Sequence, residues 1–281
     1  STEVTVGERE TAAVSFALAK GGKAAPSGMA SGVVGDAKPG LVEMVSVKGG
    51  NYRLNRISKS IDSFLIGKYE ITQGQYAEVM GAVPKGCTHA FGLGKEYPVY
   101  RVSWYDAVAF CNRLSMREGL IPAYAIGGST DPASWGEVPT YADEAWNAVT
   151  FDSGANGYRL PTDAEWAFAA QGTKPKQTEY AGGSKPDTVA WYLRNSDSRT
   201  HPVGMKEANE SGLFDMSGNV SEWCQDWNGA SFDDFTGSTT SRAIRGGGWD
   251  SSKEECRLDY MISGNPYLST DSRGFRVARR P

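Results

Sequence analysis

The sequence has little histidine, few cysteines and no long run of basic or apolar residues. Its 281 residues include two histidines, and its four cysteines are spaced too widely to match a zinc-binding pattern. With no basic run and a formal net charge of −4, the chain is not expected to bind nucleic acid. No apolar stretch is long enough to span a bilayer, and no segment resembles a secretory signal.

Glycine and tryptophan, in contrast, are abundant, with 34 and 8 residues. Many glycines together with many aromatic residues favour irregular, loop-rich packing over long helices. Residues 1–40 are predicted to form a separate N-terminal segment and linker, because Gly21 to Gly40 is rich in Gly, Ala, Pro, Ser and Lys. Residues 41–281 are then predicted to form the folded domain, since the chain is long enough for one sizeable core or two modest ones.

Three short helices are predicted from capping boxes, in which a Ser or Thr precedes a Gln, Asp or Glu by three residues. The boxes are Thr72 with Gln75, Ser103 with Asp106, and Thr162 with Glu165. Residues 41–54 are predicted to form two strands joined by a Gly-Gly turn, and residues 64–72 a further strand. Near the C-terminus, residues 274–278 alternate apolar and polar side chains, as a half-buried strand does.

The stretch GLFDMSGNVSEWCQDW at residues 212–227 contains two carboxylates seven residues apart, Asp215 and Glu222. A glycine turn between them would bring both carboxylates and the carbonyls of Gly218 and Val220 onto one cation. Hard oxygen ligands of this kind suit calcium, although the full ligand set of an EF-hand is missing. In the alternative interpretation, Asp215 caps backbone amides in a turn and Glu222 pairs with an arginine.

Several longer motifs occur in a fixed order along the chain. They are YEITQGQY at 69–76, VSWYDAVAFCNRLS at 102–115, YRLPTDAEWAFAA at 158–170, RTHPVG at 199–204, GLFDMSGNVSEWCQDW at 212–227, RAIRGGGW at 242–249 and GFRVAR at 274–279. Over residues 41–279 this set resembles the formylglycine-generating enzyme family, the sulfatase-modifying factors. The resemblance implies an α+β, C-type-lectin-like fold with little regular secondary structure. It also implies that one structural calcium ion is held by Asp215, Gly218, Val220 and Glu222.

The catalytic thiols of that family do not carry over to this chain. The resemblance implies an oxidase that acts on a sulfatase cysteine through two copper-binding thiols five residues apart. The matching positions here are Ser251 and Cys256, and a hydroxyl is a poor ligand for soft Cu(I). We therefore expect no copper and no catalytic residue, with Cys256 serving as a packing residue. Oxidation of a sulfatase cysteine is kept as the alternative function.

Residues 245–276 also resemble the variable region of the variable proteins of diversity-generating retroelements, which share this fold. In those proteins, adenine-directed mutagenesis rewrites AAC-type codons, which can then encode Asn, Asp, Ser, Tyr, Gly or Thr but not Lys, Glu, Gln, Met or Trp. The stretch between the Gly-Gly-Gly-Trp turn and the GFRVA strand is rich in the reachable types. The predicted variable, ligand-binding residues are Asp250, Ser251, Ser252, Asp259, Tyr260, Ser263, Asn265, Tyr267, Ser269, Asp271 and Ser272.

These residue types suit adaptable recognition, because Tyr gives contact area with few rotatable bonds and Ser, Gly, Asn and Asp adapt their hydrogen bonds. The sequence thus predicts a non-enzymatic ligand-binding protein, and the resemblance implies that it acts at the bacterial cell surface. The resemblance implies an outer-membrane lipoprotein, joined to the membrane only through a lipid anchor outside this chain. The expected partner is an unidentified host or bacterial surface ligand, either protein or glycan. Trp249, Cys256 and Phe275 are expected to be buried, and the variable residues exposed.

Overall fold

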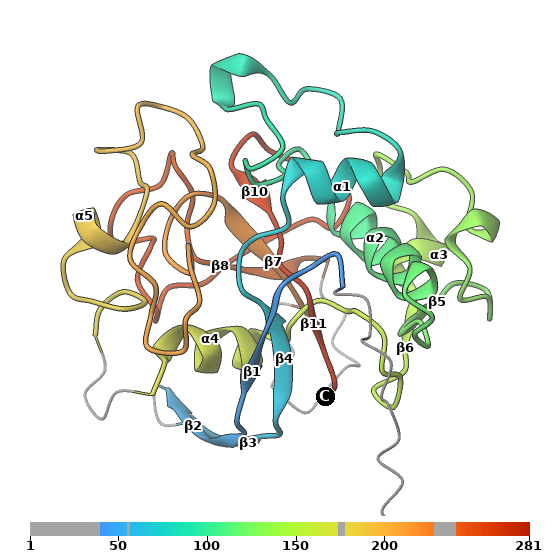
Figure 1. Ribbon diagram of the computed structural model, residues 1–281. Coiled ribbons are helices and arrows are strands. Elements are labelled where there is room, and N and C mark those ends of the chain that lie inside the picture. The colour runs from blue at the N-terminus through green and yellow to red at the C-terminus, as the bar shows by residue number, and fades with distance from the viewer. Residues whose placement is uncertain (1–39, 55–56, 174–177, 228–239) are drawn as a thin grey trace, which may run out of the picture. The chain divides into compact units, whose positions relative to one another are not determined.

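The computed structural model describes residues 40–54, 57–173, 178–227 and 240–281 (Figure 1). Residues 1–39, which hold nearly all of the predicted N-terminal segment, lie outside the described residues. The helices are α1 Gln73–Met80, α2 Trp104–Arg117, α3 Glu144–Asn147, α4 Asp163–Gln171 and α5 Pro186–Val189, with 3₁₀ turns at His89–Phe91 and Pro132–Ser134. Within the described ranges, none of the helices has the length and apolarity needed to cross a membrane.

The strands are equally short. They are β1 Met44–Val47, β2 Gly50–Leu54, β3 Ile57–Ile61, β4 Phe64–Gly67, β5 Tyr124–Ala125, β6 Thr150–Phe151, β7 Ser221–Trp227, β8 Arg242–Arg245, β9 Ile262–Gly264, β10 Arg273–Gly274 and β11 Ala278–Arg279. One sheet has the order β1-β4-β11 and another the order β10-β7-β8-β9. Figure 1 shows β11 beside β4, so the last strand of the chain lies against one of the first. The C-terminal residues therefore belong to both sheets.

The two strands predicted within residues 41–54 are present as β1 and β2, but they do not pair with each other. Instead β1 pairs with β4, and β2 pairs with β3. The backbone explains the difference, because a Cβ atom on Gly49 would lie 2.4 Å from the carbonyl oxygen of Ile61. Without a side chain, Gly49 passes close to the backbone that connects β3 to β4. The chain therefore continues from β1 into β2, and no tight turn folds the two strands against each other.

The three predicted capping boxes are confirmed at the first turns of α1, α2 and α4, each with both hydrogen bonds of the box formed. Helix α2 buries Trp104 and Leu114 completely, and α4 buries Trp166. Trp223 of β7 is likewise fully buried. Large aromatic side chains therefore fill the space between short elements, which is how a chain with little regular structure still forms a dense core.

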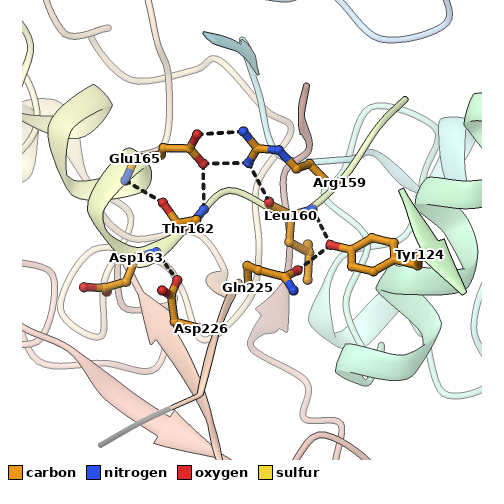
Figure 2. Close-up of polar contacts among 8 residues, drawn as sticks. All are labelled: Tyr124, Arg159, Leu160, Thr162, Asp163, Glu165, Gln225 and Asp226. Carbon is orange, nitrogen blue, oxygen red and sulfur yellow. Dashed lines mark hydrogen bonds and ion pairs between the residues drawn. The ribbon is translucent and has the colours of Figure 1, made fainter. Parts of the chain in front are cut away.

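Figure 2 shows how the segment between Arg159 and Glu165 fixes the start of α4. Arg159 and Glu165 pair through two contacts of 2.6 Å. The hydroxyl of Tyr124 accepts a hydrogen bond from the backbone N–H of Leu160 and donates one to Gln225 of β7. The segment is thereby tied both to α4, which it precedes, and to the sheet that contains β7.

A second contact in Figure 2 joins β7 to α4. Asp226 accepts a hydrogen bond of 2.5 Å from the backbone N–H of Asp163. Burial raises the pKa of Asp226 to about 6, above its ordinary value of 3.8. Between these two pKa values the folded protein keeps a proton on Asp226 that the unfolded chain has released. The resulting stabilisation is fully present below the unfolded value and is lost as the pH rises through about 6.

We expect Asp226→Asn to remove this dependence, because an amide oxygen still accepts the N–H of Asp163 but carries no charge. The difference in melting temperature between variant and wild type should therefore be more favourable to the variant at about pH 7 than at about pH 4. The same change at the exposed Asp62 is the matched control. Thermal unfolding at both pH values measures the effect, and an equal difference at the two values would contradict the assignment.

Candidate ligand-binding surface

A buried ion pair holds the C-terminal strand against the middle of the chain. Arg276 donates to both carboxylate oxygens of Glu222 at 2.7 Å, and to the carbonyls of Gly67 and Phe214 at 3.0 and 2.9 Å. The two charged side chains are only 0% and 1% exposed. The prediction of a half-buried strand over residues 274–278 is therefore wrong, because all five residues are buried and residues 275–277 are not in a strand. Glu222 supplies the counter-charge that lets the guanidinium of Arg276 face inward.

The predicted calcium motif lies around this ion pair. Asp215 accepts the backbone N–H of Gly204 at 2.7 Å, while its other carboxylate oxygen is buried and has no hydrogen-bond partner. Both oxygens of Glu222 accept from Arg276, and one also accepts the indole N–H of Trp166. A capped backbone amide and an arginine partner are the contacts that the alternative interpretation of the motif predicts.

Glu70 adds a third buried carboxylate to the same region. It accepts hydrogen bonds from the side-chain amide of Asn219 at 2.7 Å and from the backbone N–H of Val220 at 3.0 Å. Burial raises the pKa of Glu70 well above its ordinary value, and burial raises the pKa of Asp215 to about 6. Sequence reasoning missed Glu70, because a carboxylate inside a predicted strand gives no sign of what it will contact.

The fit of these residues to a cation is partial. Asp215 offers one free buried oxygen, whereas a cation at Glu222 would compete with the guanidinium of Arg276. Within the described ranges, no three His, Cys, Asp or Glu side chains are grouped so as to hold a metal. Calcium therefore stays a prediction, for the ligand set Asp215, Gly218, Val220 and Glu222.

Trp249 fixes the start of the predicted variable stretch. Its ring stacks on Phe91 with centroids 5.5 Å apart, and its indole N–H donates to the carbonyl of Asp271 at 3.0 Å. Its backbone N–H donates to the carbonyl of Asn219, and its carbonyl accepts from the hydroxyl of Ser196. Trp249 thus joins the two ends of the stretch to the neighbouring loops.

The three predicted anchors are buried, with exposures of 9% for Trp249, 1% for Cys256 and 0% for Phe275, as predicted. None of the eleven predicted variable residues is buried. The exposed ones are Asp250, Asp259, Tyr260 and Ser269. The half-buried ones are Ser251, Ser252, Ser263, Asn265, Tyr267, Asp271 and Ser272. Full exposure of all eleven was therefore too strong an expectation.

Contacts with the frame explain part of this half-burial. The hydroxyl of Ser251 accepts the backbone N–H of Gly248 at 3.1 Å. Asp271 pairs with Arg101 through two contacts of 2.5 and 2.8 Å. The carbonyl of Ser272 accepts the first amide of β7 at 2.8 Å. These three positions therefore serve the frame as well as the surface, and sequence reasoning missed Arg101 as the partner of Asp271.

The expectation that Cys256 is a packing residue agrees with its surroundings. Its side chain packs in a cluster with Tyr180, Val189 and Tyr192, and burial raises the pKa of the thiol to about 12. Burial and a protonated thiol are typical of a cysteine that packs in a core, and they make Cys256 a poor nucleophile near neutral pH. The hydroxyl of Ser251, at the position of the first thiol of the family's pair, accepts the backbone N–H of Gly248.

A cavity of about 540 Å³ lies beside two of the predicted variable residues, Asn265 and Tyr267. The other residues that line it are Ala142, Asn147, Trp227, Thr240 and Pro266. Sequence reasoning missed Asn147 and Trp227, which come from α3 and from the end of β7. No sequence signal connects them, because they meet only through the tertiary fold.

Residues 31–281 match the model of the sulfatase-modifying factor enzyme 1-like domain family. The chain belongs to this family. It is 39% identical to the chaperone protein LppX of Paenibacillus barcinonensis, over 84% of this chain and 89% of that protein. The solved structure of Treponema denticola variable protein 1 is 33% identical, with a TM-score of 0.76 over 85% of this chain and 95% of that one. The formylglycine-generating enzyme of Streptomyces coelicolor is 30% identical over 48% of this chain and half of that enzyme.

Membership in the sulfatase-modifying factor family confirms the predicted fold, an α+β, C-type-lectin-like fold of the formylglycine-generating type. Family membership alone does not fix an activity. The relatives named above include a chaperone protein and a variable protein as well as an enzyme, and a bovine relative is named an inactive formylglycine-generating enzyme. The function of this chain therefore has to be argued from its own residues.

We expect Glu222→Gln to lower the free energy of unfolding by about 3–5 kcal/mol, because it leaves Arg276 buried without a counter-charge. The matched control is Glu43→Gln, which breaks the exposed pair with Lys68 and should cost at most about 1 kcal/mol. Chelation tests the calcium prediction separately, because a bound ion stabilises only the folded state. If chelation lowers the wild-type melting temperature and Glu222→Gln removes that effect, Glu222 holds a cation, whereas an unchanged melting temperature favours the pairing with Arg276 alone.

Proposed function

We propose that this chain is a non-enzymatic binding protein whose C-terminal loops, residues 250–272, form a ligand-binding surface that a retroelement diversifies. One observation carries the proposal. Between the buried side chains of Trp249 and Phe275, none of the eleven predicted variable residues is buried. Side chains outside the core can change without loss of packing, and loops held by a rigid frame are where binding residues concentrate.

The chemistry of the surface also supports binding. Tyr260, Met261 and Ile262 are consecutive and 37–39% exposed, and Leu268 is 47% exposed. Neighbouring exposed apolar side chains among serines and aspartates offer contact area together with adaptable hydrogen bonds. The proposed ligand is a protein or glycan on a host or bacterial surface.

The proposed place of action is the bacterial cell surface, where a lipid anchor would hold the protein. A surface location gives a diversified binding face access to varied ligands. No enzymatic role is proposed, because Ser251 and the buried Cys256 do not form the thiol pair that the family's oxidases use.

We expect the frame and the surface to be separable. Trp249→Ala should lower the free energy of unfolding by about 3–5 kcal/mol, because it removes a buried indole and its contacts. A combined change of eight positions to other polar residues should leave the melting temperature within a few degrees of wild type, since none of the eight side chains is buried and substitutions outside the core mostly stay within about 0.5 kcal/mol each. The changed positions are Asp250, Ser252, Asp259, Tyr260, Ser263, Asn265, Tyr267 and Ser269.

Binding is tested with a display library randomised at those eight positions and selected against a panel of purified proteins and glycans. Folded binders should emerge from this library, and the same library built on the Trp249→Ala frame should give none. If the combined variant melts many degrees below wild type, the stretch is ordinary structure and the proposal fails.

A further inference from the structure

We propose that the cavity lined by Asn147, Trp227, Asn265 and Tyr267 binds a neutral saccharide. The inference rests on the proposed binding function, because Asn265 and Tyr267 belong to the proposed variable surface. The volume of about 540 Å³ lies within the range of small-ligand sites, which is roughly 300–1,000 Å³. The lining residues and their contacts indicate which class of ligand fits.

The described residues that line the cavity are polar or apolar but uncharged. They contribute two amides, the hydroxyls of Thr240 and Tyr267, and one indole, and none of these described residues carries a charge. A charged ligand would lose hydration here without gaining an opposite charge from the lining. Amides and hydroxyls both donate and accept hydrogen bonds, as the hydroxyl groups of a sugar also do. A neutral, polyhydroxylated ligand therefore matches the lining.

The amides are held in defined orientations. The hydroxyl of Tyr105 donates to the side-chain oxygen of Asn147 at 2.6 Å, so the amide N–H₂ of Asn147 is directed away from Tyr105. The amide nitrogen of Asn265 donates to the hydroxyl of Tyr267 at 3.2 Å. Polar groups that are oriented before binding lose less entropy when a ligand arrives.

Trp227 supplies a fixed aromatic platform. The guanidinium of Arg242 lies 3.5 Å from the centroid of the Trp227 ring and 3.7 Å from the centroid of Trp104. Arg242 is 3% exposed and donates to the carbonyl of Gln225, so this three-layer stack is anchored in the core. The electron-rich face of an indole attracts the C–H groups on the flat side of a pyranose ring.

The wall that carries the variable residues is tied to the same frame. The carbonyl of Pro266 accepts the first backbone N–H of α2, that of Trp104, at 2.9 Å. Asn147 and Trp227 lie outside the variable stretch, whereas Asn265 and Tyr267 lie within it. The fixed pair therefore sets the class of ligand, and changes in the variable pair select among saccharides.

In the experiment, a glycan array is probed with the full 281-residue chain, and the affinities of the saccharides that bind are then measured by calorimetry. The array carries neutral mono- and disaccharides, sialylated and sulfated glycans, and short neutral peptides. We expect binding to neutral saccharides. Asn147→Asp keeps the acceptor for Tyr105 but loses the donors, and Trp227→Leu loses the aromatic face, so each should weaken binding about tenfold or more, the loss of roughly one hydrogen bond or stacking contact.

Ile121→Ala is the matched control, because Ile121 is exposed, lies outside the variable stretch and does not line the cavity. Its affinity for the saccharide should equal that of wild type, and the melting temperatures of all variants show whether they fold. Binding of only acidic glycans or only peptides, no binding to the array, or saccharide affinity unchanged by both cavity variants would each overturn the proposal. Protein binders from the display library would still uphold the proposed function in those cases.

Discussion

The ion pair between Arg276 and Glu222 is the constraint on which the C-terminal part of the structure depends. Arg276 reaches the carbonyls of Gly67 and Phe214 as well as Glu222, so one side chain joins the end of the chain to residue 67 and to the segment 214–222. Neither charge is exposed to water, and separating them would leave an uncompensated charge in the core. The end of the chain is thus tied down firmly, even though β10 and β11 have only two residues each.

This firm attachment explains how a long irregular stretch can be held without regular ladders of its own. Residues 250–272 leave the frame at Trp249 and return to it at Phe275, and both side chains are buried. Between these points Cys256 packs inward, and the pair of Asp271 with Arg101 holds the last turn. None of the eleven predicted variable side chains is buried, so most of them are available for recognition.

Much of the fold could be predicted from the sequence because its signals are local. The capping boxes that begin with Thr72, Ser103 and Thr162 each lie within four residues, and the ordered motifs identified the family. Partners that meet across the fold gave no such signal. Arg276 was read as a solvent-facing residue because its partner lies in β7, and the cavity was missed because Asn147 comes from a distant helix. The pairing of β1 with β4 was missed for the same reason.

The central claim is that this frame carries a diversified binding surface. Sequencing the genomic locus around the gene tests it most directly. The account predicts a second, near-identical copy of the 245–276 coding region beside a reverse transcriptase gene. That copy should have adenines at the codons of residues such as Tyr260 and Asn265, and should be unchanged at Trp249. A locus with neither a second copy nor a reverse transcriptase would contradict the claim.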